Sequence, residues 1–187
     1  MPSPEFTVDW FSEHTPIWRE FVPPAESPCR ALEIGSYEGR SALWLLEHVL
    51  RHPESTITCI DPHRYADGMH FNQRRMNAVH KRFLRNTAPY RRTGRLIYHE
   101  APAVEVLPGL SGRYDLIYID GAHDAPSVLT DSILSWLRLN LGGLLIWDDY
   151  SWQWERSEPV NPEVARPKLA IDAFFAGVRA AVRDPTS

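Results

Sequence analysis

Short apolar segments alternate with longer amphipathic segments along most of the chain. The apolar segments are hydrophobic at successive rather than alternate positions, which is typical of strands buried on both faces of a parallel sheet. The amphipathic segments between them predict helices with one apolar face. The predicted strands are residues 29–34, 55–60, 94–100, 114–120 and 143–147.

The first predicted helix, residues 8–22, has five large apolar side chains on one side. A Pro-containing stretch ends it, and we expect this helix to lie over the functional site. Another predicted helix is rich in arginine, and a solvated face is the simpler interpretation of that charge. The apolar side chains of the first helix are Trp10, Phe11, Ile17, Trp18 and Phe21, and the other predicted helices are residues 41–51, 72–87, 103–110, 126–140 (ended by Gly142 and Gly143) and 167–182.

Five strands that alternate with helices predict an α/β fold with a Rossmann-like, doubly wound sheet. We expect five parallel strands in the order 3-2-1-4-5, with helices on both sides. The 187 residues predict a single domain, residues 1–187, in which the loop 150–166 is a candidate lid. Ligands of such sheets bind at the carboxyl ends of the strands.

Composition narrows the class of partner. The chain has 20 Lys and Arg, 24 Asp and Glu, and a formal charge of -4, which argues against nucleic acid or an anionic membrane as the main partner. No apolar run approaches the length of a membrane span, and no signal peptide is evident. The two cysteines, Cys29 and Cys59, favour a reduced, cytoplasmic protein. We therefore expect a small-molecule substrate.

The turn after the first strand reads EIGSYEGRS. Gly35 permits a sharp turn, but Tyr37 occupies the position of the middle glycine in a dinucleotide-binding motif. The carboxylates of Glu33 and Glu38 would repel a pyrophosphate. The same turn suits a ligand with a cationic centre and an amino group, and S-adenosylmethionine has both.

Two further features favour that cofactor. Gly39 and Ser41 leave the start of the next helix uncrowded and offer N–H and O–H donors. Asp61, directly after the second strand, can accept hydrogen bonds from both ribose hydroxyls.

The segments ALEIGSYEGRSALWLLEHVL, TITCID, DLIYIDGAHDAPSVLTDSILSW and GGLLIWDDY resemble the class I S-adenosylmethionine-dependent methyltransferases. The similarity is strongest to the methyltransferase domain 24 branch, and DWFSEHTPIW and PKLAIDAF also fit its bacterial members. The resemblance implies methyl transfer, with Glu33 near the amino acid moiety of the cofactor and Asp61 on its ribose. The expected cofactor-binding residues are Glu33, Gly35, Ser36, Tyr37, Gly39, Ser41, Asp61 and Asp120.

Carboxylates also follow the fourth and fifth strands. Asp120, Asp148 and Asp149 would converge if these strands are neighbours, and three carboxylates repel one another unless a cation joins them. Oxygen ligands favour Mg²⁺, or else Ca²⁺ or Mn²⁺. Such an ion could lower the pKa of a substrate hydroxyl, and His123 could then accept its proton.

The spacing of these residues resembles one group of metal-dependent enzymes. Catechol-type methyltransferases carry Asp-x-x-Lys and Asp-Asn, whereas macrolide-sugar O-methyltransferases carry Asp-x-x-His and Asp-Asp. This chain has Asp120-Gly-Ala-His123 and Asp148-Asp149. The resemblance therefore implies metal-dependent O-methylation of a sugar or small natural product.

Other interpretations remain open. A histidine after a strand is usually bonded to backbone, and an Asp-Asp pair often caps a loop, so a metal-independent methyltransferase is the first alternative. A non-catalytic scaffold with the cofactor fold is the second, and an NAD-dependent oxidoreductase is the least favoured. No strand is predicted after residue 147, so the C-terminal hairpin typical of the family is expected to be missing. The fifth strand would then be an apolar edge, which predicts a homodimer.

Overall fold

The structure is a computed structural model that describes residues 3–22, 24–64, 72–152 and 166–182. Five strands form one sheet in the order β3-β2-β1-β4-β5, and every neighbouring pair is parallel. This confirms the predicted fold class and strand order. The strands are β1 (Arg30–Ile34), β2 (Thr56–Ile60), β3 (Leu96–His99), β4 (Tyr114–Ile119) and β5 (Leu139–Trp147).

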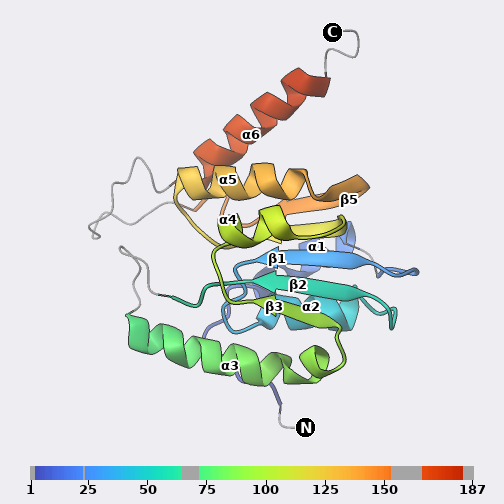
Figure 1. The fold of residues 1–187 in the computed structure, drawn as a ribbon, viewed down its shortest axis with the longest axis vertical. Coiled ribbons are helices and arrows are strands. Elements are labelled where there is room, and N and C mark those ends of the chain that lie inside the picture. The colour runs from blue at the N-terminus through green and yellow to red at the C-terminus, as the bar shows by residue number, and fades with distance from the viewer. Residues whose placement is uncertain (1–2, 23, 65–71, 153–165, 183–187) are drawn as a thin grey trace.

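Helices cover both faces of the sheet (Figure 1). α1 (Thr15–Phe21), α2 (Arg40–His48) and α3 (Gln73–Arg92) pack on one face, where buried residues of all three helices join one apolar cluster with the sheet. α4 (Ala103–Val106) and α5 (Ala125–Trp136) pack on the other face. α6 (Pro167–Val182) packs on α5 and extends away from the sheet. Short 3-10 turns at Ser12–His14 and Leu107–Gly109 complete the described elements.

The N-terminal helix differs from the prediction. It begins at Thr15 instead of residue 8, because Pro16 lacks an N–H and is suited to the first turn of a helix. Phe11 and Trp18 are buried as expected, but three other side chains of the predicted apolar side are not. Trp10, Ile17 and Phe21 are 54%, 60% and 65% exposed.

The prediction that Gly142 and Gly143 end a helix is also wrong. α5 ends at Trp136, and both glycines lie inside β5, next to a register shift against β4. Gly142 has a φ of +77°, and a Cβ on Gly143 would lie 2.9 Å from the carbonyl oxygen of Asn140. The glycines therefore permit an irregularity within the strand.

β5 is an edge strand among the described residues, and no described strand follows it. Leu141 is fully exposed on it. The homodimer that would cover this edge stays a prediction. No helix in the described ranges combines the length and apolar character needed to cross a bilayer.

Candidate active site

The turn after β1 lies against the backbone that follows β4. Gly35 has a φ of +83°, and a Cβ at this position would lie 1.9 Å from the carbonyl oxygen of Asp120. Two backbone hydrogen bonds fix the approach: Gly35 donates to Ile60 (2.9 Å) and Asp120 donates to Ile34 (2.8 Å). The strand order reverses between β1 and β4, which is where open α/β sheets bind ligands.

The Asp61 carboxylate holds this turn in place. Its Oδ2 accepts the backbone N–H groups of Ser36 and Tyr37, both at 2.9 Å. Its Oδ1 accepts the N–H of His63 at 2.7 Å. Since a carboxylate has about four acceptor positions, roughly one is left for a ligand. Binding of both ribose hydroxyls by Asp61 stays a prediction, and the protein itself occupies most of the acceptor capacity.

Glu33 stabilises the turn through hydrogen bonds inside the protein. Its carboxylate is 0% exposed and accepts the hydroxyls of Ser36 (2.6 Å) and Ser41 (2.5 Å). Burial raises the pKa of Glu33 to about 6. The serine hydroxyls therefore bind Glu33 in this structure, and direct contacts of these three side chains with a cofactor remain predictions.

Glu38 is equally buried, and its carboxylate is directed at other parts of the chain. It accepts both the N–H and the hydroxyl of Thr7 and pairs with Arg82 on α3. The expectation that Glu33 and Glu38 together repel a pyrophosphate therefore lacks support, because both side chains are engaged inside the protein.

Tyr37 adopts a positive φ of 46°, which is uncommon for a residue other than glycine. Its carbonyl oxygen lies 2.7 Å from Nε2 of His63, and this nitrogen must carry the proton because a carbonyl only accepts. Its ring lies 5.0 Å from the Trp10 ring. At the end of the same turn, Gly39 (φ +84°) caps α2. The conformation of the turn is thus fixed from several sides.

The predicted acidic residues of β4 and β5 do converge. Tyr118 lies between two of them, with its hydroxyl 3.1 Å from Oδ2 of Asp120 and 2.6 Å from Oδ2 of Asp148. Burial of the Asp120 carboxyl, followed by the negative charges of Asp148 and Asp149, raises its pKa well above the usual range. Tyr118 is not among the site residues predicted from the sequence, although its position two residues before Asp120 places both side chains on the same face of the sheet.

His123 joins this cluster from the loop after β4. Its Nε2 lies 2.9 Å from Oδ2 of Asp149, and its ring is 4.5 Å from that of Trp152. One ligand atom each from Asp120, His123 and Asp149 fall within 4.8 Å of one another, a spacing that a metal ion could bridge. Asp148 lies beside this group and accepts the N–H of Asp149 at 3.0 Å. In the structure, therefore, His123 lies closer than Asp148 to the other two candidate ligands, Asp120 and Asp149.

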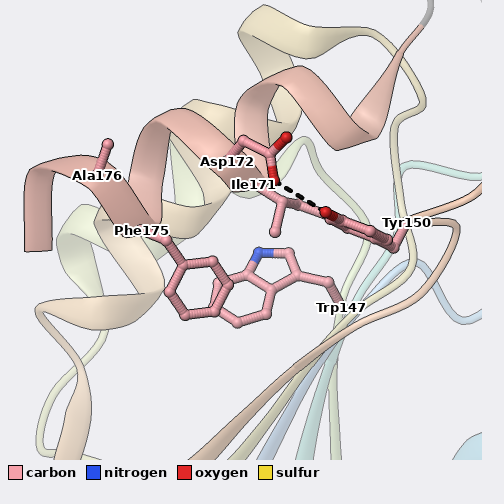
Figure 2. Close-up of a pocket in the computed structure, with 6 residues that line it drawn as sticks. All are labelled: Trp147, Tyr150, Ile171, Asp172, Phe175 and Ala176. Carbon is pink, nitrogen blue, oxygen red and sulfur yellow. Dashed lines mark hydrogen bonds between the residues drawn. The ribbon is translucent and has the colours of Figure 1, made fainter. Parts of the chain in front are cut away.

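A pocket of about 610 Å³ lies against α6 (Figure 2). Two of its lining residues, Trp147 and Tyr150, flank Asp148 and Asp149 in the sequence. Tyr150 follows Asp149 directly, and its hydroxyl donates to Asp172 at 3.0 Å. Lys168 donates to both groups. Most of the candidate lid, residues 153–165, is outside the described residues, as are residues 65–71. The pocket is lined by Trp147, Tyr150, Ile171, Asp172, Phe175 and Ala176.

A family model described as a methyltransferase domain matches residues 32–150, more than half of the chain. The chain belongs to this methyltransferase domain family. The match includes the glycine turn and the whole acidic cluster, so the resemblance seen in the sequence is confirmed.

Individual proteins that this chain resembles are also methyltransferases by name. O-methyltransferase hkm8 of Aspergillus hancockii is 29% identical over 125 residues, which are 67% of this chain and 44% of hkm8. The chain thus spans less than half the length of that curated relative. The SAH-bound methyltransferase PaMTH1 of Podospora anserina is 28% identical with a TM-score of 0.54, covering 84% of this chain and 64% of that one. A Klebsiella pneumoniae structure described as an O-methyltransferase has 21% identity and a TM-score of 0.57, covering 90% and 68%, and supports the fold alone.

Proposed function

We propose that the protein is an S-adenosylmethionine-dependent O-methyltransferase that acts on a hydroxyl of a sugar or another small natural product and depends on a divalent metal. The observation that carries the proposal is the contact between Gly35 and Asp120. It joins a cofactor-type turn directly to a cluster of carboxylates and an imidazole. The family match, the name of hkm8 and the SAH-bound state of PaMTH1 support methyl transfer.

The cofactor would lie at the carboxyl end of β1, against the turn of residues 35–39. S-adenosylmethionine, when bound, supplies an electrophilic methyl group: the C–S bond breaks as the new O–C bond forms, which leaves S-adenosylhomocysteine (SAH) and releases the hydroxyl proton. Asp61 keeps the turn in shape through the N–H groups of Ser36 and Tyr37. Asp120 forms the wall shared by the turn and the acidic cluster.

The acidic cluster fits a divalent cation. Asp120, Asp148 and Asp149 lie near one another, and the pKa of Asp120 is raised first by burial and then by the negative charges of the other two carboxylates. Their oxygen atoms suit Mg²⁺, Ca²⁺ or Mn²⁺. An ion there would lower the pKa of a hydroxyl bound to it. Asp120 and Asp149 would hold it, with His123 or Asp148 as a further ligand.

His123 is the candidate general base. With Nε2–H donating to Oδ2 of Asp149 at 2.9 Å and so orienting the ring, Nδ1 is the nitrogen that would receive the proton of the acceptor hydroxyl. The same nitrogen cannot bind a metal and accept a proton at once. If His123 is the general base, the acceptor hydroxyl must lie between His123 and the turn. If His123 is a metal ligand, it needs only to lie beside the carboxylates of the acidic cluster.

The free thiols of Cys29 and Cys59 are consistent with the cytoplasmic location that we propose. A small-molecule acceptor agrees with an acidic cluster at the site, which would repel the phosphates of a nucleic acid.

Two neighbouring carboxylates provide a matched test. Asp120→Asn removes a cluster carboxylate, whereas Asp124→Asn changes the N-cap of α5, which accepts the N–H of Ser127 at 2.9 Å, into an equally good cap. Methyl transfer from labelled S-adenosylmethionine to a panel of catechols and vicinal-diol sugars is measured with Mg²⁺ and with EDTA. We expect Asp124→Asn to retain activity, and Asp120→Asn and EDTA to abolish it.

The outcomes separate the alternatives. Activity that persists in EDTA and in Asp149→Ala supports a metal-independent methyltransferase, for which the Tyr118 bridge between Asp120 and Asp148 offers a structural basis. SAH binding without transfer to any acceptor supports a scaffold. His123→Gln with intact metal binding and lost transfer identifies a base, while lost metal binding identifies a ligand.

A further inference from the structure

We propose that the N-terminal segment, residues 5–10, forms a wall of the cofactor pocket, and that Glu38 is the positioning residue that holds it there. This inference rests on the proposed function only in assuming that the cofactor binds at the turn of residues 35–39.

Glu38 connects three separate parts of the chain. Its carboxylate accepts the Thr7 N–H at 2.6 Å and the Thr7 hydroxyl at 2.7 Å, and it pairs with the Arg82 guanidinium. Its own carbonyl oxygen accepts Nδ2 of Asn86 at 3.0 Å. The turn is thus tied to the N-terminal segment and to α3 through a single buried residue.

Further contacts keep the segment in register. Asn86 also donates to the Glu5 carbonyl and accepts its N–H, at 2.9 and 3.0 Å. At the other end, Arg40 lies 3.1 Å from Asp9. The segment is therefore fixed at both ends, and its course between them is set by the turn and α3.

The N-terminal segment places Trp10 next to the turn of residues 35–39. The Trp10 ring is half exposed, although a side chain of this size is usually well buried, and it lies 5.0 Å from the Tyr37 ring. Tyr37 itself holds a positive φ, a cost that persists only where surrounding contacts enforce it. The two rings together form an aromatic surface at the cofactor turn, one from the segment and one from the turn itself.

The ion pair between the buried carboxylate of Glu38 and the partly exposed Arg82 explains why this contact is specific. Glu38 is 1% exposed, and a buried carboxylate is costly unless it is paired and fully hydrogen-bonded. An apolar residue could fill the same space, but it could not fix the Thr7 backbone relative to the turn. The geometry is consistent with positioning as the role of this ion pair.

The inference predicts that cofactor binding depends on Trp10 and on Glu38 in a coupled way. Calorimetric titration with SAH is compared for wild type, Trp10→Ala, Thr7→Val, Glu38→Gln and the double variant Trp10→Ala/Glu38→Gln. We expect each single variant to weaken SAH binding, Trp10→Ala by on the order of tenfold. The double variant should be little weaker than the weaker single variant, because Glu38 acts through Trp10. Ile17→Ala, an exposed change on the following helix, is the matched control.

A second readout separates positioning from stability. Acrylamide quenching of tryptophan fluorescence should fall on SAH addition in wild type and not in Trp10→Phe, since bound SAH would shield Trp10. Failure of wild type to bind SAH would overturn the proposed function and this inference with it. Wild-type binding with unchanged affinity in Trp10→Ala and Thr7→Val would overturn the inference alone. Additive losses in the double variant, or losses that track melting temperature only, would also overturn it.

Discussion

A methyl group added at Gly35 tests whether the turn and the acidic cluster share one wall. In Gly35→Ala the new Cβ would lie 1.9 Å from the carbonyl oxygen and 2.5 Å from the carbonyl carbon of Asp120. These are backbone atoms, so no side chain can rotate away, and the turn must retreat by about 1.5 Å to reach ordinary van der Waals contact.

The loss in free energy of unfolding follows from the backbone strain of alanine and from the hydrogen bonds that this movement breaks. The positive φ costs alanine about 1 kcal/mol. Moving the turn also disrupts the hydrogen bonds from Gly35 to Ile60 and from Asp120 to Ile34, each a loss of about 1–2 kcal/mol when buried groups are left unpaired. We expect Gly35→Ala to lower the free energy of unfolding by about 3–5 kcal/mol and to abolish SAH binding.

Two other glycines separate these contributions. Gly94→Ala has a similar φ of +74° with nothing within 4 Å of the new Cβ, so it should cost only the φ strain, about 1 kcal/mol. Gly109→Ala has neither problem and should be neutral. Urea unfolding followed by tryptophan fluorescence measures all three. If Gly35→Ala unfolds at the same urea concentration as Gly94→Ala and still binds SAH, the described contact between the turn and Asp120 is wrong.

Three further predictions concern stability, pH and assembly. Trp18→Ala should cost about 3–5 kcal/mol in urea unfolding, because Trp18 is buried among aromatic rings, whereas the exposed Ile17→Ala should change little; equal effects would contradict the buried position of α1. Glu33 has a folded-state pKa of about 6, above its ordinary 4.5, so its contribution to stability is present when it is protonated and is lost as the pH rises through about 6. Glu33→Gln should therefore gain up to about 2 kcal/mol relative to wild type at pH 8 and less at pH 5; a pH-independent difference would refute the raised pKa. Pairing of the apolar β5 edge with a second copy predicts a dimer by light scattering at tens of micromolar, and a stable monomer would count against it.

The sequence was sufficient for the strand order and for the convergence of acidic residues at one edge of the sheet. Both follow from simple rules: apolar runs that alternate with helices form parallel sheets, and their carboxyl ends meet on one side. Element boundaries were less predictable. Gly142 and Gly143 resembled a helix stop, because a sequence pattern does not distinguish a glycine that ends a helix from one that permits an irregularity within a strand.

The direction in which each carboxylate points could not be predicted from the sequence. Glu33 and Glu38 both flank the turn, and their sequence positions do not distinguish which of them faces a ligand. In the structure Glu33 accepts two serine hydroxyls, and Glu38 pairs with Arg82, which lies 44 residues away in sequence. Such partners depend on which helix packs against the turn. The carboxylates of Asp120 and Asp149, by contrast, have no cationic Lys or Arg partner among the described ion pairs. The carboxylates that are paired within the fold support the turn. The carboxylates that lie together without a Lys or Arg partner form the part of the site where we propose that a cation and a substrate hydroxyl bind.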